Sequence, residues 1–254
     1  MSRRFLSTLL WDIRLQYRNG FYFVSVFVAV VFIILLKQLT GVDWAQLWPV
    51  ILLENLVVNS FYFMAGLVLL EKEEGTIEAQ VVTPLRQSEY LASKVVSLAV
   101  LSFFESLVLV VAVTGPGFNW LLLAAGILVL TAFYGLYGFL VVSKYDSITD
   151  FLLPSAVWVM WFSLPLLYYF DIWRSWIMFL HPLQAPLVLM QAAFETVPAW
   201  QVLYGFAYGL AWVALAGYLA RRAFHRFVVT KQGVRRRATR KSANQPTSLP
   251  ANHP

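Results

Sequence analysis

Two acidic residues, Glu54 and Glu105, lie inside long apolar stretches of the sequence. A carboxylate near the centre of a bilayer is costly, so such residues usually face a cavity or a polar partner. Their placement is compatible with a polar site for a cationic or zwitterionic substrate, or with a protonation switch. The structural alternative is a protonated carboxyl group bonded to a neighbouring helix or, for Glu54, a side chain at the headgroup level.

Other polar and aromatic side chains accompany these two acids. Asn55 and Asn59 are four residues apart, so a helix places them on one face beside Glu54. They could line a path, but we favour hydrogen bonding between two helices. We expect packing rather than ligand stacking from the aromatic residues Phe133, Tyr134, Tyr137, Trp158, Trp161 and Phe162. His181 precedes Pro182 and is expected to shape a loop, and no metal-binding cluster is predicted.

The stretch 71–94 has the composition of a docking element. Gly75 allows a sharp backbone break, Thr76 can cap a short helix, and Thr83 with Pro84 forms a second helix start. Its acids outnumber its bases: Glu71, Glu73, Glu74, Glu78 and Glu89 are opposed by Lys72, Arg86 and Lys94. We interpret the stretch as an element that binds a cytoplasmic partner through charge pairs, the alternative being a solvated acidic loop.

The elements that position these residues are predicted to be membrane helices. Hydrophobic residues make up 60% of the chain and charged residues 13%, whereas soluble domains average about 25% charged residues. A spanning helix needs about 20 mostly apolar residues. Six stretches meet this description and predict an all-α integral membrane fold: 21–36, 47–70, 95–114, 119–143, 151–170 and 200–220.

Charge placement decides the topology. Residues 176–194 are long enough to span, but Pro182 and Pro186 each remove a helix hydrogen bond. With six spans and a cytoplasmic N-terminus, 17 of the 19 Lys and Arg residues lie inside, as the positive-inside rule requires. A seventh span would place the basic C-terminal residues outside. We therefore predict that residues 171–199 form an outer loop that dips into the cell membrane without crossing it, and that both termini are cytoplasmic.

Three regions follow from this topology. Residues 1–20 are predicted to form a cytoplasmic interfacial helix, and residues 21–222 the transmembrane domain. Residues 223–254 form a basic tail, expected to be disordered, whose arginines favour anionic membrane lipids over nucleic acid. The sequence contains no cysteine, which excludes disulfides and a thiolate nucleophile.

The stretch 71–94 resembles the signature of type 2 permeases of ATP-binding cassette (ABC) transporters. It is similar in particular to the drug- and antibiotic-export branch, including fluoroquinolone export permeases. The resemblance rests on Glu71, Lys72, Glu73, Gly75, Thr76, Ile77, Glu78, Thr83, Pro84, Glu89 and Lys94. Ser93 departs from the pattern, because many relatives have Gly there. The six-span layout extends the resemblance, less specifically, to nearly the whole chain.

The resemblance implies a division of labour. The segment after Gly75 and Thr76 would be a coupling helix seated in a groove of a separate ABC ATPase subunit, which would use the ATP and Mg²⁺. The present chain would bind no cofactor, in keeping with the absence of a phosphate-loop motif from its sequence. A second copy or a sister permease would complete the pathway for a hydrophobic or amphipathic drug, and the complex would confer antibiotic resistance.

Two other classes remain open from the residues alone. A proton- or ion-coupled secondary transporter would use Glu105 as its coupling acid. A membrane-embedded enzyme acting on lipids would need a cluster of His, Asp or Glu at the inner interface, and the sequence offers no convincing one.

Overall fold

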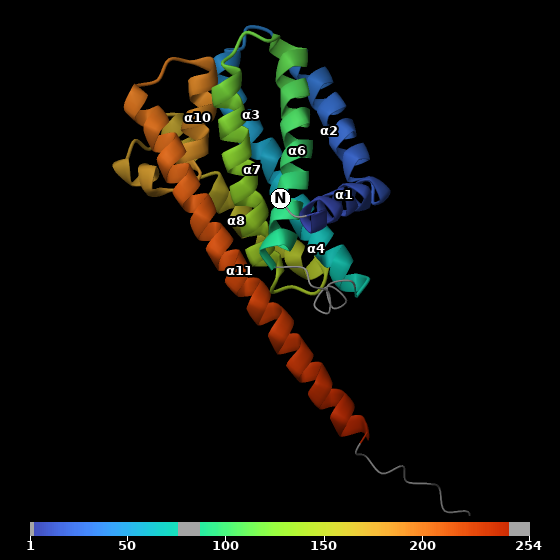
Figure 1. Cartoon of the computed structure of the whole chain (residues 1–254). Coiled ribbons are helices and arrows are strands. Elements are labelled where there is room, and N and C mark those ends of the chain that lie inside the picture. Colours follow the sequence, from blue (N-terminus) through green and yellow to red (C-terminus); the bar gives the residue numbers. More distant parts are fainter. Residues whose placement is uncertain (1–2, 76–86, 244–254) are drawn as a thin grey trace, which may run out of the picture.

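The computed structural model describes residues 3–75 and 87–243, with side chains for residues 4–75 and 87–224 (Figure 1). Every regular element in these ranges is helical. In chain order they are α1 (Arg3–Arg18), α2 (Phe21–Leu36), α3 (Trp44–Leu56), the π-helix η1 (Val57–Tyr62), α4 (Phe63–Glu73), α6 (Gln87–Thr114), α7 (Trp120–Val142), α8 (Ile148–Phe162), α9 (Pro165–Tyr169), the 3₁₀ helix η2 (Trp176–Leu180), α10 (Gln184–Phe194) and α11 (Ala199–Ala243).

The described helices confirm an all-α membrane fold. Five helical stretches are long and apolar enough to cross a bilayer, and α3, η1 and α4 together form the first of them. A sixth span results if α1 and α2, which meet at a bend of 62°, are counted as one. Five of the spans predicted from the sequence correspond to α3–α4, α6, α7, α8–α9 and the first part of α11. The span predicted over 21–36 coincides with α2, whose 16 residues are long enough to cross only when they are counted together with α1.

The bend between α1 and α2 lies at Gly20. Its φ of 78° is in the left-handed region, which glycine adopts without steric cost. Figure 1 shows that α1 consequently lies across the long axes of α2 and α6 instead of continuing the bundle. This orientation agrees with an amphipathic helix at a membrane surface.

Helix α7 lies in the middle of the bundle, where it packs against α6, α10 and α11. Two glycines permit its closest approaches. A Cβ atom added at Gly138 would lie 2.8 Å from the carbonyl oxygen of Phe61, and one at Gly126 would lie 2.6 Å from Cγ of Met190. Small residues allow such close backbone contacts between membrane helices.

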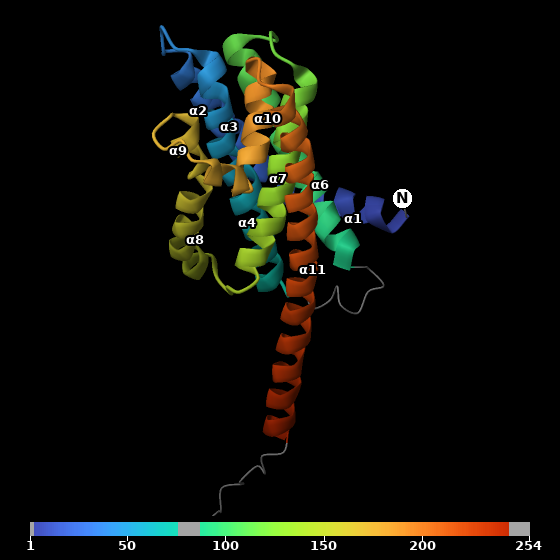
Figure 2. The same ribbon diagram turned by 90° about the vertical axis from the view of Figure 1, so that its left-hand side faces the viewer.

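The segment between α8 and α11 folds back into the bundle. Helix α10 has 11 residues, about 16 Å of helix, which is too short for the roughly 30 Å hydrocarbon core. It packs among α3, α7 and α11 (Figure 2). His181 shapes the turn before α10: its Nδ1 accepts a hydrogen bond from the backbone N–H of Leu183, and its ring lies 4.3 Å from that of Trp161. These features agree with the predicted non-crossing loop.

The predicted disordered tail needs a correction over residues 223–243. Helix α11 continues through this stretch to Ala243 and projects from the bundle (Figure 1). The stretch is rich in Arg, Lys and Ala, which have high helix propensity, and the first proline after it is Pro246. Lack of apolar periodicity indicated lack of packing, but it did not exclude a helix that continues from a span.

The close backbone contact at Gly138 predicts that a larger residue at this position lowers the stability of the protein. Replacing Gly138 with Ala places a methyl group against the backbone of Phe61, and overpacking of this kind costs about 1–3 kcal/mol. We expect a lower melting temperature for the detergent-solubilised protein. The control is Gly117→Ala, because a Cβ atom there meets no atom within 4 Å. Equal melting temperatures for the two variants would contradict the close contact between α7 and η1.

Candidate functional site

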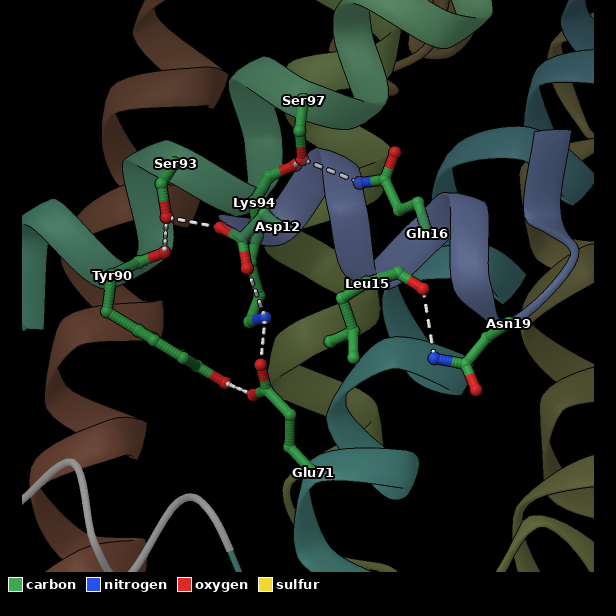
Figure 3. A network of polar contacts seen from close by, with 9 residues as sticks. All are labelled: Asp12, Leu15, Gln16, Asn19, Glu71, Tyr90, Ser93, Lys94 and Ser97. Atoms are coloured by element: carbon green, nitrogen blue, oxygen red, sulfur yellow. Dashed lines mark hydrogen bonds and ion pairs between the residues drawn. The ribbon is translucent and has the colours of Figure 1, made fainter. Parts of the chain in front are cut away.

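Lys94, in the second turn of α6, has a fully buried side chain. Its ammonium group pairs with Glu71 of α4 and, at 3.1 Å, with Asp12 of α1. Both carboxylates are buried as well, with side-chain exposures of 4% and 3%. Figure 3 shows that the three groups point toward one another from three separate helices.

Two hydroxyl groups also donate hydrogen bonds to these carboxylates. Tyr90 Oη donates to Oε2 of Glu71 at 2.6 Å, and Ser93 Oγ donates to Oδ2 of Asp12 (Figure 3). We call Asp12, Glu71, Tyr90, Ser93 and Lys94 the root network. Its charged groups are both paired and hydrogen-bonded, which is the condition under which buried charges are tolerated.

A neighbouring contact strengthens the attachment of α1 to α6. Gln16 Nε2 donates to Oγ of Ser97 at 2.7 Å, one turn along from the root network (Figure 3). The root network itself joins Glu71 to Lys94, which lie 23 residues apart at the two ends of the stretch 71–94. The part of this stretch between α4 and α6 is called the acidic loop below. Both ends of the loop are therefore attached to each other and to α1.

The acids nearer the loop lie outside this network. Glu73 and Glu74 are exposed, and Arg18 Nη2 donates to Oε1 of Glu74 at 3.2 Å. Gly75 follows with a φ of 68°, so the break predicted at the end of the second span is observed. Glu89 lies in the first turn of α6, where the helix dipole favours a negative charge.

The remaining predicted docking residues cannot be placed. Thr76, Ile77, Glu78, Thr83 and Pro84 lie outside the described residues. Their assignment to a coupling helix stays a prediction.

Sequence reasoning grouped Glu71 with the docking acids and did not anticipate Asp12. The structure places Glu71 inside the bundle. A signal for Asp12 was available, because Phe5, Asp12, Leu15 and Gln16 recur at helical spacing and form the buried face of α1. An acid on that face needs a partner, although the sequence does not say which one.

Lys72 connects α4 to the end of α7. Its Nζ donates to the carbonyl oxygens of Val142 and Ser143, each at 3.3 Å, and to that of Tyr145. Asp146 lies 3.8 Å away. A cation at this position satisfies carbonyls that the end of a helix leaves without intrahelical donors.

The second polar site lies within the membrane-spanning part. The buried carboxyl group of Glu105 accepts hydrogen bonds from Asn55 Nδ2 at 3.5 Å and from Asn59 Nδ2. Ser25 of α2 approaches the same carboxyl group, but its hydroxyl completes no hydrogen bond of normal geometry. No basic side chain of the described ranges forms an ion pair with Glu105.

The π-helix η1 begins two residues after Asn55 and includes Asn59. π-Helical turns are rare and often occur at functional sites. The two amides bind Glu105 of α6 and thus hold two helices together, as favoured from the sequence. They do not act with Glu54, whose carboxylate instead accepts a hydrogen bond from Ser163 Oγ at 2.8 Å.

The aromatic residues between α7 and α8 pack against one another. The Tyr137 ring lies 5.6 Å from Phe133 and 5.3 Å from Trp158, and Tyr134 lies 4.9 Å from Phe162. Among the described residues, no group of His, Cys, Asp and Glu could hold a metal ion.

A helical bundle with five or six segments long and apolar enough to span a bilayer, and with a buried polar cluster at mid-span, is the architecture of a multi-pass membrane protein. The model of the fluoroquinolones export permease protein family matches residues 3–232, and the chain belongs to this family. It is 33% identical, over 234 residues, to the fluoroquinolones export permease proteins of Mycobacterium tuberculosis strains CDC 1551 and H37Rv. The alignment covers 91% of this chain and 99% of each relative.

The root network predicts unequal effects of its substitutions. Lys94→Met leaves Asp12 and Glu71 without a counter-charge, and breaking a buried pair in this way costs about 3–5 kcal/mol. Glu71→Gln keeps the pair with Asp12 and an acceptor for Tyr90, so we expect a smaller loss. Thermal unfolding of the solubilised variants measures both effects.

The control for this series is Arg18→Gln, which removes an exposed ion pair worth about 0–1 kcal/mol. If Lys94→Met unfolds at the temperature of the control, the root network does not hold the three helices together.

Proposed function

We propose that this chain is the membrane subunit of an ABC exporter that moves a small hydrophobic or amphipathic compound out of the cell. Membership of the fluoroquinolones export permease protein family over residues 3–232 carries the proposal. The two mycobacterial relatives are named for fluoroquinolone export, so fluoroquinolones are the first substrates to test. Antibiotic resistance would be the physiological consequence.

In this proposal the acidic loop docks on the ATPase subunit, which hydrolyses ATP with Mg²⁺. Glu73 and Glu74 are exposed beside the loop and could meet basic side chains of the partner. Because Glu71 and Lys94 are bonded to each other and to Asp12, a displacement of the loop would move α1, α4 and α6 together. The loop would thereby act on the bundle.

The arrangement in the membrane is also part of the proposal. Both termini would lie in the cytoplasm, because this orientation places 17 of 19 Lys and Arg residues inside. A second copy or a sister permease would complete the transport pathway in the cell membrane.

The test begins with affinity purification of the full chain from its native cells and identification of the bound proteins. We expect a stoichiometric ATPase subunit. Replacing both Glu73 and Glu74 with Lys should reduce the retained ATPase at least about tenfold, since like charges juxtaposed at an interface repel the partner. The matched charge-reversal control is Arg174→Glu, an exposed residue of the predicted outer loop.

Absence of any ATPase from the wild-type preparation, under conditions that preserve such complexes, would count against the ABC assignment. Equal ATPase retention by the double Lys variant and the control would instead show that the acids at the end of α4 do not contribute to docking.

One observation favours a second candidate, a proton- or ion-coupled carrier. Glu105 is held by two neutral amides, with no basic partner in the described part of the chain, so it could exchange a proton or a cation.

Fluoroquinolone efflux from cells separates the two candidates. For an ABC exporter we expect efflux to stop when ATP is depleted and to continue when a protonophore removes the proton gradient. A coupled carrier would show the reverse, and Glu105→Gln would abolish its efflux. Because Gln keeps an oxygen that can accept from Asn59, the variant should remain folded, which its melting temperature checks.

A further inference from the structure

A groove of about 550 Å³ lies among α7, α8 and α11. Lys144 and Arg222 line it near the end of α7, and none of the described side chains that line it is acidic. Its walls are apolar and aromatic, formed among others by Leu140, Trp158 and Leu219. The groove thus combines two cationic side chains with mainly apolar walls.

Aromatic side chains bridge α7 and α8 beside this groove. Tyr137 of α7 contacts Trp158 and Phe162 of α8, with ring centroids 5.3 and 5.5 Å apart, so ring contacts rather than close backbone packing join the two helices here. The spans that include α8 and α11 are the least buried of the five candidate spans. Only 22% and 17% of the residues in their most apolar parts are buried inside the bundle. The groove therefore lies beside the two candidate spans that the rest of the bundle covers least.

The two cations are available to a ligand. The terminal carbonyls of α7, which would attract Lys144, already accept hydrogen bonds from Lys72 of α4. Neither Lys144 nor Arg222 forms an ion pair with a residue of the described ranges. Two like charges that line one groove of low polarity favour an anion between them.

The position of the charges along α7 indicates the shape of that anion. Tyr137 is five residues before the end of α7 and Lys144 two residues beyond it, so about 8 Å of helix and two further residues separate the charged end of the groove from its aromatic end. In the proposed orientation the charged end lies at the headgroup level of the cytoplasmic leaflet, and the aromatic end lies at the level of the acyl chains. Basic pockets between membrane helices on this side bind anionic lipid headgroups.

We propose that the groove binds one anionic phospholipid of the cytoplasmic leaflet, with its phosphate between Lys144 and Arg222 and an acyl chain along Leu140 and Leu219. A lipid fits better than a transported drug because the groove lies beside the two least covered spans, and Glu105 and the amides that bind it are not among its lining residues. The choice of leaflet rests on the orientation given under the proposed function, but lipid binding requires neither ATP nor transport, so a failure of the lipid test and a failure of the exporter test are distinguishable.

The test uses the purified full chain in detergent, titrated with phosphatidylglycerol or phosphatidylcholine of identical acyl chains, with bound lipids counted by native mass spectrometry. We expect one tightly retained phosphatidylglycerol per chain. Two interfacial cations should give about 30-fold preference over phosphatidylcholine. Replacing both Lys144 and Arg222 with Gln should abolish that preference, whereas Arg221→Gln, on the same helix but outside the lining, should retain it.

A second variant, Ala223→Trp, fills the groove and keeps both cations, and it should also lose the bound lipid. The proposal is overturned if either groove variant retains phosphatidylglycerol as the wild type does, or if the wild type binds both lipids equally. It is likewise overturned if a fluoroquinolone displaces the lipid at equimolar concentration, which would make the groove a substrate site, or if a second chain occupies the groove in its place.

Discussion

The burial of one ammonium group, that of Lys94, constrains the part of this bundle where α1, α4 and α6 meet. A buried cation must be paired and hydrogen-bonded, and its two carboxylate partners come from α1 and α4. Helix α1 is therefore held across the bundle, and the corner at Gly20 lets α2 turn away from it. The same pairing holds together the two helices that enter and leave the acidic loop.

A second constraint, the close approach of α7 to η1, operates deeper in the bundle. Gly138 brings the backbones of these helices into contact, and η1 carries one of the two amides that bind Glu105. Close packing in the centre and polar contacts at mid-span thus depend on the same short π-helical segment. The contact between α7 and α8 differs in kind, since aromatic rings, among them Tyr137 and Trp158, meet there.

Local patterns predicted the local features well. Apolar length identified the spans, and the glycine at position 75 marked the end of α4 because its backbone conformation is a property of a single residue. Pairings between distant residues were not predictable: Lys94 and Asp12 are 82 residues apart, and several helices offered alternative partners for Asn55. The continuation of α11 was missed because hydrophobic periodicity reports burial, whereas helix propensity also acts in exposed segments.

The π-helix η1 fixes the rotational phase between α3 and α4. A π-turn holds one residue more than an α-turn, so its conversion to α geometry would turn α4 about its own axis by about 100° relative to α3. That rotation would carry Glu71 away from Lys94 and change the direction of Asn59 toward Glu105. The π-helical conformation of these six residues therefore determines both which polar groups meet at mid-span and which meet at the base of the acidic loop.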